Sequence, residues 1–323
     1  MKWNDRIGRR LKLHDLHVFL TVAEMGSMGK AAERLAVSQP SVSKAIADME
    51  RTIGVPLLVR LPQGVQTTPY GRALIRRGMG AFDELRRGIK DIEFLTDPTA
   101  GEVRVGCPEA VASGLLLGVL PRFCEQHPRV VVNVHEANNM LQEYRLLRDR
   151  NVDFLLGGVA KPLGEQDFDM EVLYEDRPFI VSGPKNPWAN RRKIELAELV
   201  DEPWVLPRES IFSSLLADAF QSKGLAFPTK GVRSYSVCER ISLLATDAFI
   251  AAESGSVLRF NAHRLKLKVL PVDLTTGFFQ VGIVTLKNRT ISPVVQTFLD
   301  YVRKVASSLA HETISPPFLI ARG

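Results

Sequence analysis

Three short runs of apolar residues at helical spacing, separated by tight turns, open the chain and limit what it can fold into. Leu13, Leu16 and Leu20 form the first stripe, and small residues mark the second run, at about 28–35. Gly26-Ser27 lies between these runs, because glycine accepts the left-handed conformation that ends a helix and serine caps the next one. Ser38 opens a third helix in the same way, with proline following in the first turn. The sequence therefore predicts a helix-turn-helix.

The outer face of the third helix is polar where its inner face is apolar. Gln39, Ser41, Ser43 and Lys44 lie on that outer face, near the start of the helix. An amide, hydroxyls and an ammonium group at this place suit a recognition helix in the DNA major groove. Glutamine pairs with adenine, and the hydroxyls and the lysine suit phosphates. A helical bundle whose polar face meets only water is the alternative.

A β-wing is expected after these helices. Leu61-Pro62-Gln63-Gly64 has the turn residues of a hairpin between two short strands, and Arg60 lies next to its tip. Residues 1–95 carry 16 Lys and Arg against 10 Asp and Glu, whereas the rest of the chain carries 26 of each. The whole net charge of +6 therefore lies in the first third, as expected for a module that meets a polyanion. A solvated basic face is the alternative.

A long linker helix should begin at Thr68-Pro69 and run to about Leu95, because a cap followed by proline starts a helix. Its apolar residues follow a heptad seam, which needs a partner helix and so predicts a dimer. The expected dimerisation residues are Ile75, Phe82, Leu85, Ile89 and Ile92. Packing of this helix on its own domain is the alternative.

These residues resemble the winged helix-turn-helix signature of LysR-type transcriptional regulators. The resemblance rests on the run from Ala31 to Ile46, AAERLAVSQPSVSKAI, followed by Glu50, Gly54, Leu57, Arg60 and Thr68-Pro69-Tyr70-Gly71. It implies a homodimer or homotetramer that binds double-stranded promoter DNA. The DNA contacts it implies are Ser38, Gln39, Pro40, Ser41, Ser43 and Lys44, with Arg60 supporting them from the wing.

Two details refine the resemblance. Met28-Gly29 stands where the family usually has an aromatic residue and then threonine, so Gly29 lacks a hydroxyl that often binds phosphate. Gly71-Arg72-Ala73-Leu74 and residues 91–95 also resemble a subgroup named for regulating a galactose-binding protein.

The C-terminal two-thirds should form an α/β domain. After a turn-rich hinge at 96–101, strand and helix patterns alternate, which indicates a parallel sheet covered by helices. One helix is expected from Val111 to Gln126. The resemblance implies a two-lobed, periplasmic-binding-protein-like (type 2) effector domain. The predicted organisation is α/β overall, with a winged helix-turn-helix at 1–69, a linker helix at 70–95 and an effector domain at 96–323, divided into lobe I, about 101–180 and 278–310, and lobe II, about 181–277.

Ligands of such folds bind where strands end, between the lobes. Glu109 and Ser113 follow the first expected strand of this domain, Asn138 follows the second, and Ser236 precedes a helix of the second lobe. We expect Ser113, Asn138 and Ser236 to hydrogen-bond a small effector and Glu109 to pair with its hydroxyl or amine. Such an acid favours a neutral polyol or a cation over a dicarboxylate. Helix capping or turn chemistry is the alternative for each residue.

Other function classes find little support. Three scattered cysteines without a C-x-x-C pair predict neither a disulfide framework nor a zinc site, and no cofactor or metal is expected. Cys107, at the end of a strand, is a candidate nucleophile with a lowered pKa, and His127, His135, Asp153 and Glu136 are candidate bases. No catalytic motif accompanies them, so an enzyme is the weaker alternative.

A transport-type binding protein is the second alternative, and it would need a signal peptide. The N-terminus is a poor one, and no apolar run approaches the ~20 residues of a membrane helix. We therefore expect a cytoplasmic, non-enzymatic regulator with RNA polymerase as a candidate partner.

Overall fold

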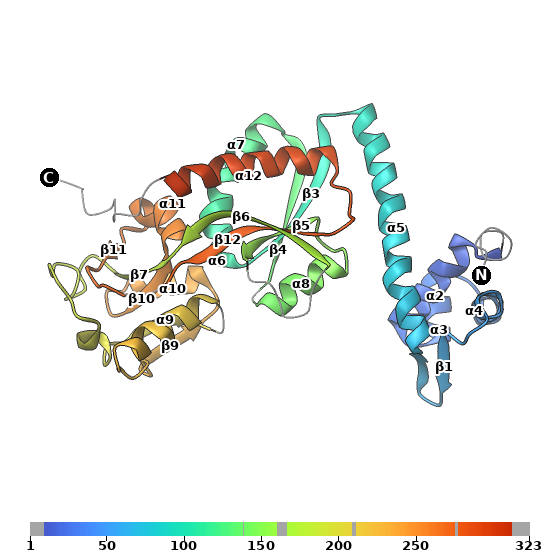
Figure 1. Ribbon diagram of the computed structural model, residues 1–323, viewed down its shortest axis with the longest axis horizontal. Coiled ribbons are helices and arrows are strands. Elements are labelled where there is room, and N and C mark those ends of the chain that lie inside the picture. The colour runs from blue at the N-terminus through green and yellow to red at the C-terminus, as the bar shows by residue number, and fades with distance from the viewer. Residues whose placement is uncertain (1–9, 138, 160–166, 209–210, 275–276, 312–323) are drawn as a thin grey trace. The chain divides into compact units, whose positions relative to one another are not determined.

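The computed structural model describes residues 10–137, 139–159, 167–208, 211–274 and 277–311. The chain divides into two units, Met1–Ile89 and Lys90–Gly323, and helix α5, Pro69–Thr96, runs from the first into the second (Figure 1).

The first unit is a winged helix-turn-helix. Its other elements are the helices α2 (Leu13–Met25), α3 (Met28–Leu35) and α4 (Gln39–Ile53), and the antiparallel strands β1 (Leu58–Leu61) and β2 (Gly64–Thr67). Ser27 caps α3 and Ser38 caps α4, each through its side-chain oxygen. Phe19, Val22 and Val42 are fully buried in the shared core. The helix-turn-helix and the wing expected from the sequence are confirmed.

The second unit begins with a mixed five-stranded sheet in the order β4-β3-β5-β12-β6. β3 lies parallel to β4 and β5, and β12 lies antiparallel to β5 and β6. Its strands are β3 (Ala100–Cys107), β4 (Arg129–Glu136), β5 (Phe154–Gly158), β6 (Phe168–Asp176) and β12 (Phe279–Leu286). The helical elements that follow or cover these strands are α6 (Glu109–Val111), the π-helical turn η1 (Ala112–Leu116), α7 (Leu117–Gln126), α8 (Met140–Arg148) and α12 (Pro293–His311).

A second five-stranded sheet has the order β11-β7-β10-β8-β9. Its strands are β7 (Pro178–Ser182), β8 (Trp204–Pro207), β9 (Gly231–Ser234), β10 (Ile250–Ser254) and β11 (Lys268–Val269). Its helices are the 3-10 turn η2 (Leu196–Leu199), α9 (Ile211–Ser222), α10 (Val237–Leu244) and α11 (Gly255–Leu265). The chain crosses from the first sheet to the second at Arg177, between β6 and β7, and returns before β12. The two sheets are the cores of two lobes, here called lobe I and lobe II.

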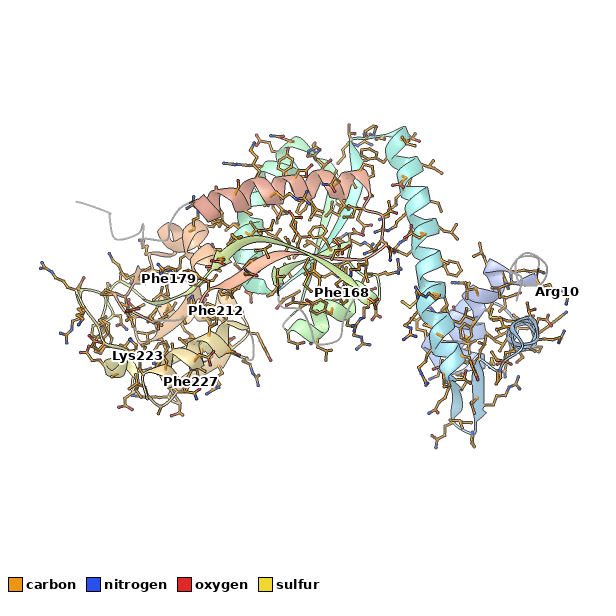
Figure 2. The ribbon with its side chains drawn as sticks, viewed as in Figure 1. Arg10, Phe168, Phe179, Phe212, Lys223 and Phe227 are labelled. Atoms are coloured by element: carbon orange, nitrogen blue, oxygen red, sulfur yellow. The ribbon has the colours of Figure 1, made fainter. Side chains whose placement is uncertain are left out.

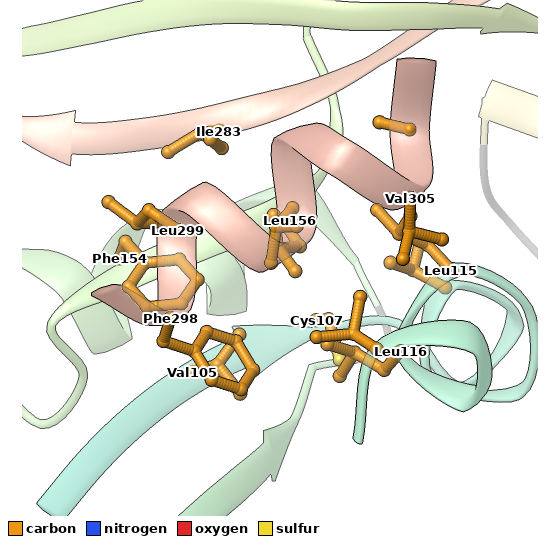
Figure 3. Packing of buried hydrophobic residues seen from close by; sticks show 14 of the residues in the cluster. Val105, Cys107, Leu115, Leu116, Phe154, Leu156, Ile283, Phe298, Leu299 and Val305 are labelled. Atoms are coloured by element: carbon orange, nitrogen blue, oxygen red, sulfur yellow. The ribbon is translucent and has the colours of Figure 1, made fainter. Parts of the chain in front are cut away.

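Buried side chains of α12 hold lobe I together. Phe298 and Leu299 lie against Phe154 and Leu156 of β5, as Figure 3 shows, and all four are fully buried. The rings of Phe154 and Phe298 are 6.0 Å apart. Burying one such side chain contributes about 1.5–3 kcal/mol, so this layer stabilises the sheet of lobe I.

The helix expected from Val111 to Gln126 is wrong as a single element. The chain widens into a π-helical turn at Ala112–Leu116, between α6 and α7. Gly114 in this turn packs so closely on α11 that a Cβ there would lie 2.9 Å from the Ser256 hydroxyl. Contact with a helix far along the sequence therefore reshapes the segment. Among the described residues, none of the helices is long and apolar enough to cross a bilayer.

Candidate nucleic-acid interface and interlobe cleft

The start of α4 presents polar groups to solvent. Ser38, Gln39, Ser41 and Lys44 are exposed, and the half-buried Ser43 lies between them. The Ser38 side chain accepts a hydrogen bond from the Ser41 amide at 3.4 Å, and the two hydroxyls are 2.8 Å apart. The helix thus begins with an exposed amide, hydroxyls, a cation and the positive end of its dipole, which together favour a polyanion.

The opposite side of α4 explains this orientation. Val42, Ile46 and Met49 are buried in the core of the unit, so the remaining positions must face outward. Pro40 occupies the first turn, where the missing amide hydrogen costs nothing. Met28 fills the core position where an aromatic residue is usual, since it is 8% exposed.

Two contacts fix the wing against the helices. The Glu50 carboxylate in α4 accepts hydrogen bonds from the backbone amides of Leu57 at 2.7 Å and of Leu58 at 3.1 Å. The Val65 amide donates to the carbonyl of Gly26 at 2.9 Å. This approach requires glycine at position 64, where φ is 138° and a Cβ would lie 2.4 Å from the Gly26 carbonyl oxygen. Glu50 was recognised in the sequence only as part of a signature; its role in holding the wing depends on contacts that the pattern does not show.

Arg60 lies in β1 with its side chain exposed. Exposed guanidinium groups on a wing are placed to contact phosphate.

The predicted dimerisation seam falls into two parts. Ile75 and Phe82 pack partly against the core of the first unit, and the Phe82 ring lies 5.7 Å from that of His17. Leu85, Ile89 and Ile92 are 48%, 59% and 64% exposed, respectively. The later residues of the seam are therefore its most exposed part, and self-association stays a prediction.

A cavity of about 410 Å³ lies between lobes I and II. It lies at the end of the strands where β3 and β5 run into their following segments, with Glu109 and Gly158 in its wall. Lobe II contributes Phe212, which Figure 2 labels on α9, and the first residues of α10. The Phe212 ring lies 6.0 Å from that of Phe279 in β12, so aromatic groups from both lobes meet at this site.

The four predicted effector residues take different positions. Glu109 lines the cavity, but its carboxylate accepts hydrogen bonds from the Val237 and Cys238 amides at 2.8 and 3.1 Å. Ser236 caps α10, accepting from the Glu239 amide at 3.2 Å, and its hydroxyl is 3.5 Å from Glu109.

Ser113 lies in the π-helical turn, where its carbonyl accepts from Asn261 Nδ2 at 2.6 Å. Neither Ser113 nor Ser236 is among the described residues that line the cavity. Asn138 lies outside the described residues. Its neighbour Asn139 lines the cavity and caps α8.

Three acidic residues of the cleft were missed in the sequence. Glu143 of α8 is 8% exposed, and burial alone raises the pKa of its carboxyl to about 7. Asp176 is 1% exposed, and burial raises its pKa, while hydrogen bonds from Ser256, Arg177 and Gly255 act in the opposite direction. The signal for Glu143 was present, because it lies one helical turn before the fully buried Leu147, on the apolar face of α8.

Glu253 forms a buried ion pair with Arg240. The guanidinium donates from Nε to Oε1 at 2.6 Å and from Nη2 to Oε2 at 3.1 Å, and both side chains are at most 5% exposed. Two parallel hydrogen bonds of this kind fully engage both charges. The Arg240 charge in the cleft wall is therefore already neutralised.

Cys107 does not have the lowered pKa that a nucleophile needs. Burial, with the nearby Glu143 and Glu136 carboxylates adding to it, raises the pKa of this thiol to about 12. The thiol is fully buried in the core of lobe I and stays protonated at neutral pH. The sequence-based alternative of a cysteine nucleophile is wrong for this reason.

Both units of the chain are similar in sequence to known proteins. Residues 96–307 match the profile of the LysR substrate binding domain, and residues 13–72 match that of the bacterial regulatory helix-turn-helix protein, lysR family. The HTH-type transcriptional regulator TdcA of Escherichia coli (strain K12) is 28% identical over 286 residues, covering 88% of this chain and 85% of TdcA. The HTH-type transcriptional regulator GbpR of Azospirillum brasilense is 25% identical over 311 residues, covering 95% and 90%.

Solved structures agree in fold. A full-length OxyR variant from Pseudomonas aeruginosa superposes with a TM-score of 0.62 at 20% identity, covering 92% of this chain and 94% of that one. Full-length CbnR complexed with its target DNA superposes with a TM-score of 0.51 at 18% identity, covering 92% and 100%. Since the substrate-binding profile alone matches more than half of the sequence, the chain belongs to the LysR family of DNA-binding transcriptional regulators.

Proposed function

We propose that the chain binds promoter DNA through the exposed start of α4 and through the wing, as a homodimer or homotetramer. The observation that carries this proposal is the solvent-facing set of Gln39, Ser41 and Lys44 at the start of a capped helix. Two such helices in a dimer would read successive major-groove faces about 34 Å apart. The chain is a regulator and not an enzyme, and we place it with the chromosome, in the cytoplasm.

A small-molecule effector in the interlobe cleft is the second part of the proposal. The volume of about 410 Å³ lies within the usual range for small-molecule sites, and the wall combines aromatic rings with a few charged groups. An effector would shift the equilibrium between two arrangements of the subunits only by binding one of them more tightly. Through this shift it would change DNA bending and the contact with RNA polymerase.

The DNA-reading role of Gln39 is tested with Gln39→Ala. We expect the preference for the promoter fragment over a scrambled duplex to fall about tenfold, because one base-specific amide contact is lost. Fluorescence anisotropy titrations with both duplexes measure this ratio. Gln221→Ala is the matched control, since this glutamine is also exposed but lies in α9 of lobe II. An unchanged preference in Gln39→Ala would contradict the proposed role.

Lys44→Ala separates phosphate contacts from base reading. It should weaken binding to both duplexes equally and reduce the slope of log affinity against log salt by about one. Loss of preference without loss of affinity would assign Lys44 to base contacts instead.

A further inference from the structure

Most charged groups in the wall of the cleft already have partners. Glu109 caps α10, and Asp176 accepts hydrogen bonds from the first amides of α11, Gly255 at 2.9 Å and Ser256 at 3.2 Å. A helix N-terminus attracts anions, so at α10 and α11 the protein's own carboxylates hold the places that an anionic ligand would otherwise take.

Glu143 differs from these acids. Its side chain lines the cavity and is more than nine-tenths buried, yet among the described residues no hydrogen bond or ion pair engages its carboxylate. The carboxylate lies beside Gly157 at the end of β5, where a Cβ would be 3.0 Å from Glu143 Oε2. An ionised carboxylate buried without a partner is costly, and a positively charged ligand would remove this cost.

The charge balance of the cavity wall also favours a positively charged ligand. Four carboxylates, those of Glu109, Glu143, Asp176 and Glu253, face two guanidinium groups, those of Arg208 and Arg240. Arg240 is neutralised by Glu253, and Arg208 is exposed and stacks over the Tyr235 ring at 5.3 Å. An anion in the cleft would therefore meet an excess of negative charge.

Apolar and aromatic side chains make up most of the remaining wall, beside Asn139, Ser213, Ser214, Ser254 and Ser256. Phe212 and Phe279 lie on opposite lobes with their rings in edge-to-face contact, and Val111, Val237 and Val281 line the same cavity. The apolar part of this surface favours a ligand with a hydrophobic body.

We propose that the effector is a compact hydrophobic amine, whose ammonium group binds the Glu143 carboxylate while its apolar body packs against Phe212 and Phe279. This inference rests on the proposed function, in which the cleft holds the effector. It moves the ligand-binding role from Glu109, which the sequence favoured, to Glu143. In this arrangement the bound ammonium group supplies the partner that the described residues do not provide for Glu143.

Three probes with the same aromatic body test the head group: phenethylamine, phenethyl alcohol and hydrocinnamate. We expect phenethylamine to bind the full-length chain at least about tenfold more tightly than the other two, because a charge-assisted hydrogen bond forms only with the ammonium group. Isothermal titration calorimetry gives the dissociation constants. Equal or tighter binding of hydrocinnamate or phenethyl alcohol would overturn the inference, as would no binding of phenethylamine at millimolar concentration.

Variants of Glu143 test whether its carboxylate binds the ammonium group. Glu143→Gln should weaken phenethylamine binding about tenfold or more, with circular dichroism reporting that the variant is folded. Glu143→Asp keeps the charge and should retain part of the affinity. Glu136→Gln is the matched control, because Glu136 is an exposed acid at the end of β4 and is not among the described residues of the cavity wall. Unchanged affinity in Glu143→Gln would overturn the assignment.

The pH dependence gives an independent readout. Cys107 from β3 lies near Glu143, and the other charged groups of the cavity wall are Glu109, Asp176, Glu253, Arg208 and Arg240. Amine binding should strengthen as the pH rises through about 7, where Glu143 ionises while the amine stays protonated. Affinity that does not change with pH would contradict the inference.

Promoter binding distinguishes this inference from the proposed function. If hydrocinnamate binds and changes promoter affinity, the cleft is an effector site and only the amine is wrong. If no promoter fragment is bound at all, the proposed function fails, and the calorimetric comparison of the three probes still decides the ligand class.

Discussion

Replacing Glu143 by glutamine should stabilise the ligand-free chain, and only above a defined pH. Burial raises the pKa of this carboxyl from 4.5 to about 7. Between these values the folded chain holds a proton that the unfolded chain has released, so the free energy of unfolding falls as the pH rises. One unit of pKa corresponds to about 1.4 kcal/mol, and the full cost is therefore about 3 kcal/mol above pH 7.

Glutamine has the same shape and carries no charge, so the variant escapes this cost. The difference in unfolding free energy between Glu143→Gln and the wild type should be near zero below the unfolded pKa of 4.5 and reach about 3 kcal/mol above the folded pKa. Urea unfolding followed by circular dichroism at a series of pH values between about 4 and 8 measures this difference. Groups that titrate in both proteins cancel in the subtraction.

Glu136→Gln serves as the control, because loss of an exposed carboxylate changes stability by no more than about 0.5 kcal/mol. A Glu143→Gln variant that is equally stable at every pH, or less stable above pH 7, would refute the reasoning. Such a result would mean that the carboxylate has a partner in the folded chain that compensates for its burial.

Two further predictions concern single contacts. Glu109→Ala removes the acceptor of the Val237 and Cys238 amides, so it should cost about 1–2 kcal/mol and speed hydrogen exchange at these two amides; unchanged exchange would show that the cap is not formed. Gly71→Ala should destabilise the first unit by about 3 kcal/mol or more, because a Cβ would lie 2.2 Å from the Leu57 carbonyl oxygen. In Gly88→Ala the added Cβ has no described neighbour within 4 Å, so this change should stabilise its helix by up to about 1 kcal/mol. Thermal unfolding measures both glycine variants, and a Gly71→Ala chain more stable than the Gly88→Ala chain would refute this reasoning.

The N-terminal unit could be predicted from sequence because its signals are local. Ser27 and Ser38 cap the helices that they precede, Pro69 begins α5, and the apolar spacing of α4 decides which of its residues face outward. Gln39 and Lys44 were therefore expected on the outer face, where both are exposed. Their contacts with DNA remain predictions.

The sequence predicts the location of the cleft, but it does not predict which of its side chains are free to bind a ligand. Glu109 was expected there because it follows a parallel strand, and it does line the cavity. Its hydrogen-bond partner Val237 lies 128 residues further along the chain, so no local pattern could show that its carboxylate is already engaged. The apolar face of α8 marks Glu143 as a buried position, one helical turn before Leu147, but no local pattern shows that it lines the cavity.

The hydrogen bond between Val65 and Gly26, together with the Glu50 carboxylate, has a consequence for the entropy of association. These contacts hold the wing against the helices, which restrains the separation of Arg60 and Lys44 before a duplex binds. DNA binding then costs less conformational entropy, because the hairpin is already ordered. More of the favourable contact energy therefore contributes to affinity. If Arg60 and Lys44 both contact the duplex, as proposed, a groove whose width does not match their separation should bind less tightly, because the hairpin has little freedom to adjust.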